Sequence, residues 1–98
     1  MVDFAHSLPR SVLVLPLITQ VVKSGTSIGA NYMEADATLT KRDFRHAMVI
    51  CRKEAKETRH WLRMIARAVP EKTSEARMLW QEAHELVLIF SAIVKKQT

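Results

Sequence analysis

The sequence has few of the residues that build loops, disulfides or strands. Only two glycines and three prolines occur among its 98 residues, and no run alternates between apolar and polar residues as a half-buried strand would. A single cysteine, Cys51, excludes an internal disulfide and is typical of a reducing compartment, so we expect a cytoplasmic protein with an inert core thiol. Ten acidic residues against fifteen lysines and arginines give a formal net charge of +5, which favours anionic partners.

No apolar run is long enough to cross a bilayer. The apolar stretch over residues 12–22 is shorter than the roughly 20 residues that a spanning helix needs. Pro16 interrupts this stretch, and Asp3 precedes the basic Arg10. We therefore expect neither a membrane segment nor a signal peptide.

Helical spacing of apolar residues extends through the chain after Arg10, which predicts an all-α protein. We expect one domain over residues 1–98, with a short apolar leader and turn over 1–10 and helices over 11–37, 41–69 and 74–96. Thr40 and Asp43 have the pattern of a capping box, and Thr73 or Ser74 is expected to cap the last helix. Long helices with short connections form an antiparallel up-down bundle.

The predicted helix over residues 41–69 sorts its charges onto one side. An α-helix turns about 100° per residue, and at that spacing a set of lysines and arginines falls within a sector of roughly 120°. Apolar residues, among them Met48, Cys51 and Leu62, fill the opposite sector. We name the charged set the basic stripe; it consists of Lys41, Arg42, Arg45, Arg52, Lys53, Lys56, Arg59, Arg63 and Arg67.

The basic stripe has an energetic cost. Like charges three or four residues apart destabilise a helix by about 0.2–0.5 kcal/mol per pair. The one obvious opposite-charge pair on the stripe is Lys53 with Glu57. A surface made only for solubility would mix both signs of charge. The stripe therefore predicts a binding surface for an anion, and a merely solvated face is the alternative that the sequence leaves open.

Two motifs resemble known sites but lack essential parts. Gly25 and Gly29 lie in a phosphate-loop-like segment without the Gly-Lys-Ser/Thr ending, so we interpret them as helix-packing positions. Glu57 and His60 have the Glu-x-x-His spacing of di-iron bundles, but no second such pair occurs. The histidines show no ligand spacing. We therefore expect no metal, no cofactor, no catalytic residue and no enzymatic activity.

Four polar residues border apolar faces of the predicted helices. We expect Asn31, Glu34, Glu54 and Glu57 to form interhelical hydrogen bonds that fix the register of the bundle. A carboxylate or metal hydrolase site on the three glutamates is the alternative. The tryptophans Trp61 and Trp80 are interpreted as core or interface anchors before base-stacking platforms.

The last predicted helix has more apolar residues than one buried stripe requires. Residues 86–90 are apolar on every side of it, and residues 12–18 form a second uncharged run. This excess predicts contacts between subunits and hence a homo-oligomer. The alternative is a last helix buried at the centre of the bundle.

Three segments resemble the four-helix-bundle proteins called 23S rRNA-intervening sequence proteins. They are Gly25-Thr26-Ser27-Ile28-Gly29-Ala30-Asn31-Tyr32 with Glu34-Ala35, Lys41-Arg42-Asp43-Phe44, and Lys53-Glu54-Ala55-Lys56-Glu57-Thr58-Arg59-His60-Trp61-Leu62. The resemblance implies a cytoplasmic homopentamer without catalytic residues or cofactor. Family members usually have a full first helix, so it also implies that residues 1–10 are the remnant of that helix, leaving three long ones.

A related branch of the family adds a functional direction. The accessory variability protein of diversity-generating retroelements works with a reverse transcriptase and binds nucleic acid through a basic surface. By this resemblance, we expect a non-enzymatic oligomeric bundle that binds RNA, or DNA, through the basic stripe, with a larger nucleic-acid-processing protein as a further partner. The alternative is a protein-interaction scaffold whose basic face meets an acidic protein and that has no nucleic-acid role.

Overall fold

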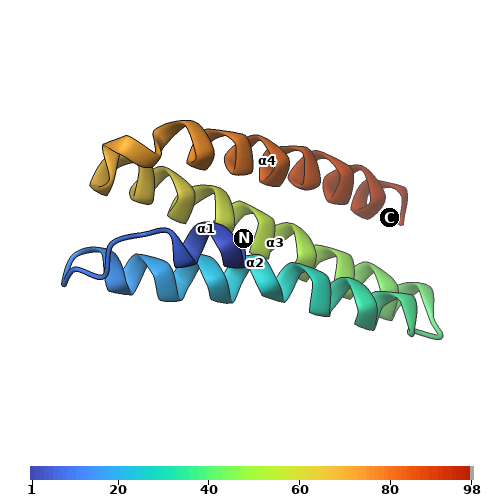
Figure 1. The fold of residues 1–98 in the computed structure, drawn as a ribbon. Coiled ribbons are helices and arrows are strands. Elements are labelled where there is room, and N and C mark those ends of the chain that lie inside the picture. Colours follow the sequence, from blue (N-terminus) through green and yellow to red (C-terminus); the bar gives the residue numbers. More distant parts are fainter. Residues whose placement is uncertain (98) are drawn as a thin grey trace.

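The computed structural model describes residues 1–97, and within that range it contains helices and no strands. Along the chain these are α1 (Val2–His6), α2 (Val14–Asp36), α3 (Lys41–Ala68), the 3-10 turn η1 (Pro70–Lys72) and α4 (Thr73–Lys96). α3 lies between α2 and α4 and packs against both, whereas α2 and α4 make little contact with each other (Figure 1). Short connections make consecutive long helices antiparallel, so the predicted all-α bundle with three long helices is confirmed.

α2 begins at Val14, not at Ser11 as predicted. Ser11 instead holds the preceding turn, because its hydroxyl accepts from the Val14 N–H at 3.2 Å and its carbonyl accepts from the Leu15 N–H at 2.9 Å. Pro16 therefore falls in the first turn of α2, where a missing N–H leaves no helical hydrogen bond unmade.

The two other long helices begin in different ways. Thr40 caps α3 as predicted, with an extended backbone and a hydroxyl that accepts from the Asp43 N–H at 3.1 Å. The prediction for α4 was wrong, because its N-cap is Lys72 and no side chain caps it. η1 leads straight into α4, so Thr73 is already helical and its hydroxyl points back to donate to the Pro70 carbonyl at 2.7 Å.

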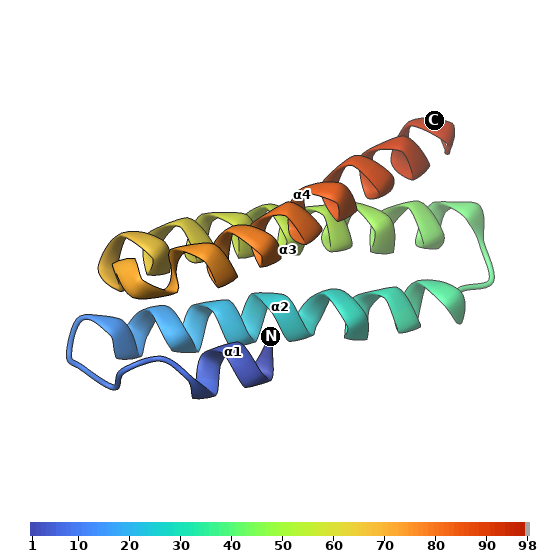
Figure 2. The ribbon, with the colours of Figure 1, turned by 45° about the horizontal axis from the view of Figure 1, so that its top comes forward.

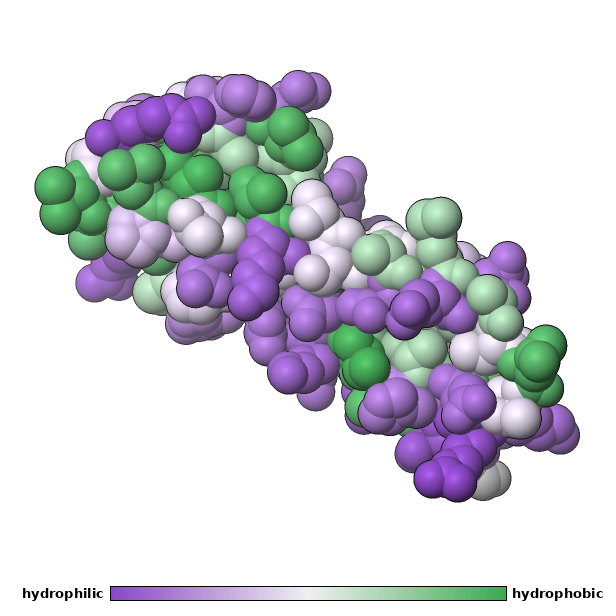
Figure 3. Space-filling model, turned by 90° about the horizontal axis from the view of Figure 1, so that it is seen from below, coloured by the Kyte–Doolittle hydropathy of each residue, from purple (hydrophilic) through white to green (hydrophobic). Residues whose placement is uncertain are grey.

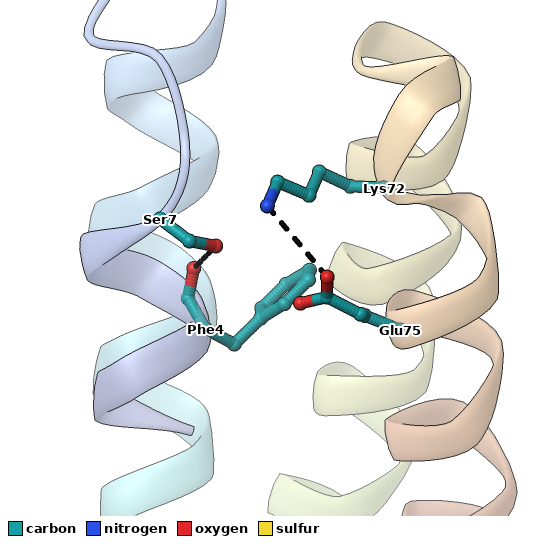
Figure 4. A network of polar contacts seen from close by, with 4 residues as sticks. All are labelled: Phe4, Ser7, Lys72 and Glu75. Atoms are coloured by element: carbon teal, nitrogen blue, oxygen red, sulfur yellow. Dashed lines mark hydrogen bonds and ion pairs between the residues drawn. The ribbon is translucent and has the colours of Figure 1, made fainter.

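The short helix α1 closes one end of the bundle. Phe4 and Leu8 are buried in a core cluster that α2, α3 and the start of α4 complete. The Phe4 ring points from α1 toward the first turn of α4, where Lys72 and Glu75 form an ion pair at 3.6 Å (Figure 4). α1 thus covers the end of the molecule where α2 begins and α3 ends.

Beyond α1 the surface of α2 is uncovered. A Cβ built on Gly25 would lie 3.1 Å from the Met1 Cγ, so Gly25 allows the close approach of α1. A Cβ on Gly29, one turn further along α2, would meet nothing within 4 Å. Tyr32 and Met33 beyond it are exposed, and α4 swings away from α2 toward its C-terminal end (Figure 2). The packing interpretation thus holds for Gly25 within this chain, and Gly29 faces open space.

Part of the apolar excess seen in the sequence is exposed. α4 is not the buried central helix, since Leu88 and Ile89 are 57% and 53% exposed and α3 takes the central place. Val12 and Leu13 are also exposed, and hydrophobic side chains gather at the end of the molecule where α2 begins (Figure 3). No helix in the part of the chain that the structure describes is long and apolar enough to span a membrane.

One buried polar contact joins α2 to α3. The hydroxyls of Thr58 and Ser24 lie 3.0 Å apart, and both residues are only 2% exposed. The Thr58 hydroxyl is also 2.8 Å from the Glu54 carbonyl in its own helix, and Ser24 Oγ lies 3.5 Å from the Val21 carbonyl. The two hydroxyls have two protons, so one proton lies in the contact between them and the other goes to one of these backbone carbonyls.

Cys51 lies in a second core cluster, where Met48, Val87 and Phe90 are also buried. Burial raises the pKa of the Cys51 thiol above its ordinary value, because desolvation disfavours the charged thiolate. The prediction of a core thiol is confirmed.

We predict that Thr58→Val, which keeps the shape of the side chain, lowers the free energy of unfolding by about 1–2 kcal/mol, because Ser24 loses its interhelical partner. Ser24→Ala added to Thr58→Val is expected to cost less than the sum of the two single changes. Urea denaturation of the four proteins measures this coupling, and strictly additive effects would show that the hydroxyl pair does not join the helices.

We also predict a pH dependence that comes from Cys51. Below the ordinary thiol pKa of about 8.5 both the folded and the unfolded protein hold the proton, so the thiol adds no pH dependence. Above it the unfolded chain ionises first, and the free energy of unfolding falls as pH rises. Urea denaturation at neutral and alkaline pH should show a steeper decline for the natural protein than for Cys51→Ala. Equal slopes would contradict the raised pKa.

Candidate nucleic-acid interface

The basic stripe lies along one side of α3. α3 is an unbroken helix of 28 residues, so the sector of the helix that holds the lysines and arginines forms a continuous line on the molecule. Arg45, Arg52 and Arg59 are partly buried, and the other members of the stripe are exposed. The geometry of the stripe is as the sequence predicts, and its role in binding stays a prediction.

No carboxylate neutralises the stripe within residues 1–97. The predicted ion pair of Lys53 with Glu57 does not form there, and the ion pair of Lys72 with Glu75 lies off the stripe, at the start of α4. Two glutamates of α3, Glu54 and Glu57, lie next to the stripe. Both are partly buried. Within residues 1–97, no ion pair with a carboxylate therefore offsets the positive charge of the basic stripe.

Two aromatic residues of α4, Trp80 and His84, lie beside the C-terminal part of the stripe on α3. The guanidinium carbons of Arg59 and Arg63 each lie 5.8 Å from the centroid of the Trp80 ring. The His84 imidazole stacks on Trp80, with centroids 4.9 Å apart and planes 10° from parallel. α4 thus holds two cations of α3 against one indole.

A hydrogen bond fixes Arg59 further. Its Nη1 lies 2.8 Å from Nδ1 of His84. Arginine can only donate, so Nδ1 accepts and the imidazole proton of His84 is on Nε2. Arg59 keeps its remaining N–H donors for a ligand, and its guanidinium is held in place before any ligand arrives.

Arg59, Arg63 and Trp80 line a pocket of about 260 Å³, which we name the Trp80 pocket. Its lining is Lys56, Arg59, His60, Arg63 and Trp80, so it contains no carboxylate. A recess of about 420 Å³ shares Arg63 and Trp80 with it, and Leu62, Ala66 and Ala76 give this recess apolar walls. Arg63 and Trp80 thus line both the cationic Trp80 pocket and the largely apolar recess.

The depression at the other end of the stripe has a lining of mixed charge. A depression of about 700 Å³ is lined by Lys41, Arg42 and Arg45, but also by Asp43, His46 and Gln97. The Nε atom of Arg45 is buried there without a hydrogen-bond partner among the described residues. Arg52 and Lys53 lie between this depression and the Trp80 pocket along α3, and Arg67 lies beyond them on the last turn.

The four polar residues predicted to join helices do not do so in the described part of the chain. Asn31 donates to the Ser27 carbonyl of its own helix at 2.9 Å, and Glu34 is exposed. No interhelical hydrogen bond from Glu34, Glu54 or Glu57 occurs within residues 1–97. Their long side chains start at the border of the apolar face and can reach water, whereas Ser24 and Thr58 are short enough to meet where the helices approach closely.

Sequence reasoning did not place Trp80 and His84 in the site. It interpreted Trp80 as a core or interface anchor, and the structure leaves it partly exposed beside the stripe. The available signal was their spacing of four residues, which puts them on one face of a helix. Among residues 1–97, no group of three His, Cys, Asp or Glu side chains is arranged to hold a metal ion.

Comparison with known proteins gives this site its family context. The sequence profile of the family described as 23S rRNA-intervening sequence protein matches residues 2–91. No curated protein matches. A crystal structure of a protein of unknown function from the S23 ribosomal protein family of Bacteroides thetaiotaomicron is similar at 28% identity and a TM-score of 0.82, over 95% of this chain and 83% of that one.

The family resemblance drawn from residues 25–35, 41–44 and 53–62 is therefore confirmed by a match over most of the chain. The fold agrees with it, since the solved S23 family structure superimposes on nearly all of the helices described above. The chain belongs to the 23S rRNA-intervening sequence protein family.

Proposed function

We propose that this protein is a non-catalytic, oligomeric helical bundle that binds RNA, or another nucleic acid, through the basic stripe. The observation that carries the proposal is the uncompensated positive charge along one side of α3. At about 1.5 Å per residue, α3 is roughly 40 Å long, close to the 44 Å extent of the whole molecule. A polyanion is the ligand that can contact such a line of charge throughout.

The stripe fits phosphates better than bases. Arg45, Arg52 and Arg59 are partly buried, which limits the orientations of their side chains, and guanidinium forks match phosphate oxygens. Contacts to phosphates position a protein on a nucleic acid without reading its sequence. Binding should therefore be strongly salt-dependent and tolerant of sequence.

The name of the family supports this direction, because it refers to an intervening sequence of 23S rRNA. A cytoplasmic location and cooperation with a larger nucleic-acid-processing protein belong to the same proposal. An acidic protein is the competing partner, and it would meet the same residues. Binding to RNA at physiological salt separates the two.

Self-association is the second part of the proposal. The exposed apolar residues Leu88 and Ile89 lie on α4, and Tyr32 and Met33 lie on α2 beyond the reach of α1. Gly29 faces open space on α2, so a helix of another subunit can approach the backbone there as closely as α1 does at Gly25. We propose a second copy of this chain as the occupant, with the pentamer implied by the family as the expected assembly.

We predict that replacing Arg45, Arg52, Arg59 and Arg63 together by Gln weakens binding of structured RNA by about ten-fold or more at moderate salt, because several phosphate contacts are lost. Filter binding measures the affinity. The matched control replaces Arg10, Lys23, Lys95 and Lys96 by Gln, which lowers the net charge equally, from +5 to +1, off the stripe. Unchanged binding by the stripe variant, or an equal loss in the control, would contradict the proposal.

We predict that light scattering on a size-exclusion column gives a mass several times the 11.2 kDa of one chain. The double variant Leu88→Glu, Ile89→Glu should shift this mass to smaller species, since buried charges destabilise an interface. Leu39→Glu, at a residue that is 98% exposed in the turn after α2, is the control and should keep the assembly. A monomeric natural protein would rule out the oligomer.

A further inference from the structure

We propose that the Trp80 pocket is a terminal-phosphate site: it binds the phosphomonoester at one end of a nucleic-acid strand while the rest of the stripe contacts internal phosphates. This inference rests on the proposed function and adds a specific ligand to one part of the same surface. It starts from the difference between the pocket and the remainder of the stripe. The pocket is a hollow with a wall on α4, whereas Arg52 and Lys53 lie on the open side of α3.

The charge of the pocket exceeds what an internal phosphate neutralises. Lys56, Arg59 and Arg63 bring three formal positive charges to a space of about 260 Å³, and no carboxylate lines it. An internal phosphodiester has one negative charge. A phosphomonoester has a charge of about −1.5 to −2 at pH 7 and three strong acceptor oxygens. The dianion at a strand end therefore matches the pocket better than any phosphate within the strand.

The arginines of the pocket are arranged before a ligand binds. Trp80 lies 5.8 Å from both guanidinium carbons, and His84 Nδ1 accepts one N–H of Arg59 at 2.8 Å. One donor of Arg59 is thus used and the others remain available. Ordering two guanidinium groups in advance removes part of the entropic cost of binding.

The indole serves the arginines and not a base. His84 already stacks on Trp80 with nearly parallel planes, so one face of the ring is covered, and the two guanidinium groups lie over the same ring system. A base that stacked on the face covered by His84 would have to displace the imidazole. The pocket is for this reason assigned to a phosphate and not to a flipped nucleobase.

The neighbouring recess has room for the nucleoside that bears the phosphate. It shares Arg63 and Trp80 with the pocket, and its walls include Leu62, Ala66 and Ala76. Thr73 and Gln81 also line it and can form hydrogen bonds with a sugar or base edge. A strand end that places its phosphate among the three cations can therefore place its last nucleoside in the adjacent recess.

The test compares strand ends with fluorescent single-stranded RNA of one sequence, prepared with a 5′-phosphate, with a 3′-phosphate, or with hydroxyl groups at both ends. Fluorescence anisotropy at constant salt gives the dissociation constants of the natural protein. We expect one phosphate-ended strand to bind about ten-fold more tightly than the hydroxyl-ended strand, an effect in the range of a charge-assisted hydrogen bond. Hydroxyl-ended strands that are one and two nucleotides longer add one and two phosphodiester charges, and so bracket the added charge of about −1.5 to −2.

Two variants separate the pocket from the stripe. Lys56→Gln and Arg63→Gln should each weaken binding and also reduce the preference for the phosphate end to within about two-fold, because the dianion loses its excess of cations. Arg52→Gln removes a stripe charge outside the pocket, so it should weaken binding of all strands and keep the preference. Circular dichroism checks that each variant is folded.

The outcomes distinguish this inference from the proposed function. If the natural protein binds all ends equally, or if Arg52→Gln reduces the preference as much as Arg63→Gln does, the terminal-phosphate site is wrong and general RNA binding stands. If the natural protein binds no strand, both fail together.

Discussion

The structure depends on the burial of one face of α3 between α2 and α4. Met48, Cys51 and Leu62 on that face are fully buried, and the two outer helices touch α3 far more than they touch each other. Because α3 must present its apolar sector to both neighbours, its charged residues can only lie on what remains, a single line toward solvent. The same sorting thus stabilises the fold and produces the basic stripe.

The packing of α3 also explains why the charge of the stripe has different surroundings along its length. At its C-terminal part α4 lies close enough for Trp80 and His84 to order Arg59 and Arg63. Toward the other end α4 swings away from α2, and the members of the stripe there share their hollow with Asp43. The same sequence pattern therefore produces an ordered cationic pocket at one end of α3 and an open surface of mixed charge at the other.

Much of the fold could be predicted from the sequence, because the helical period and the Thr40 cap are local signals. The start of α4 could not, since α4 is entered through the 3-10 turn Pro70–Lys72, whose geometry depends on how α3 ends. The stripe itself follows from spacing on one helix. Trp80 and His84 could not be added to it from the sequence, because that requires knowing which face of α4 meets α3. Interhelical hydrogen bonds were likewise assigned to Asn31 and the glutamates, while the structure uses the short pair Ser24 and Thr58 between α2 and α3 and the pair Arg59 and His84 between α3 and α4.

The central claim is that the uncompensated charge of α3 binds the phosphates of a nucleic acid. The most direct test is the salt dependence of RNA binding by the natural protein. For single strands, log K should fall linearly with log salt with a slope of about −0.7 for each phosphate contacted, so a slope of roughly −3 or steeper is predicted for a ligand that lies along the stripe. Binding that is absent at low salt, or that does not change with salt, would contradict the account.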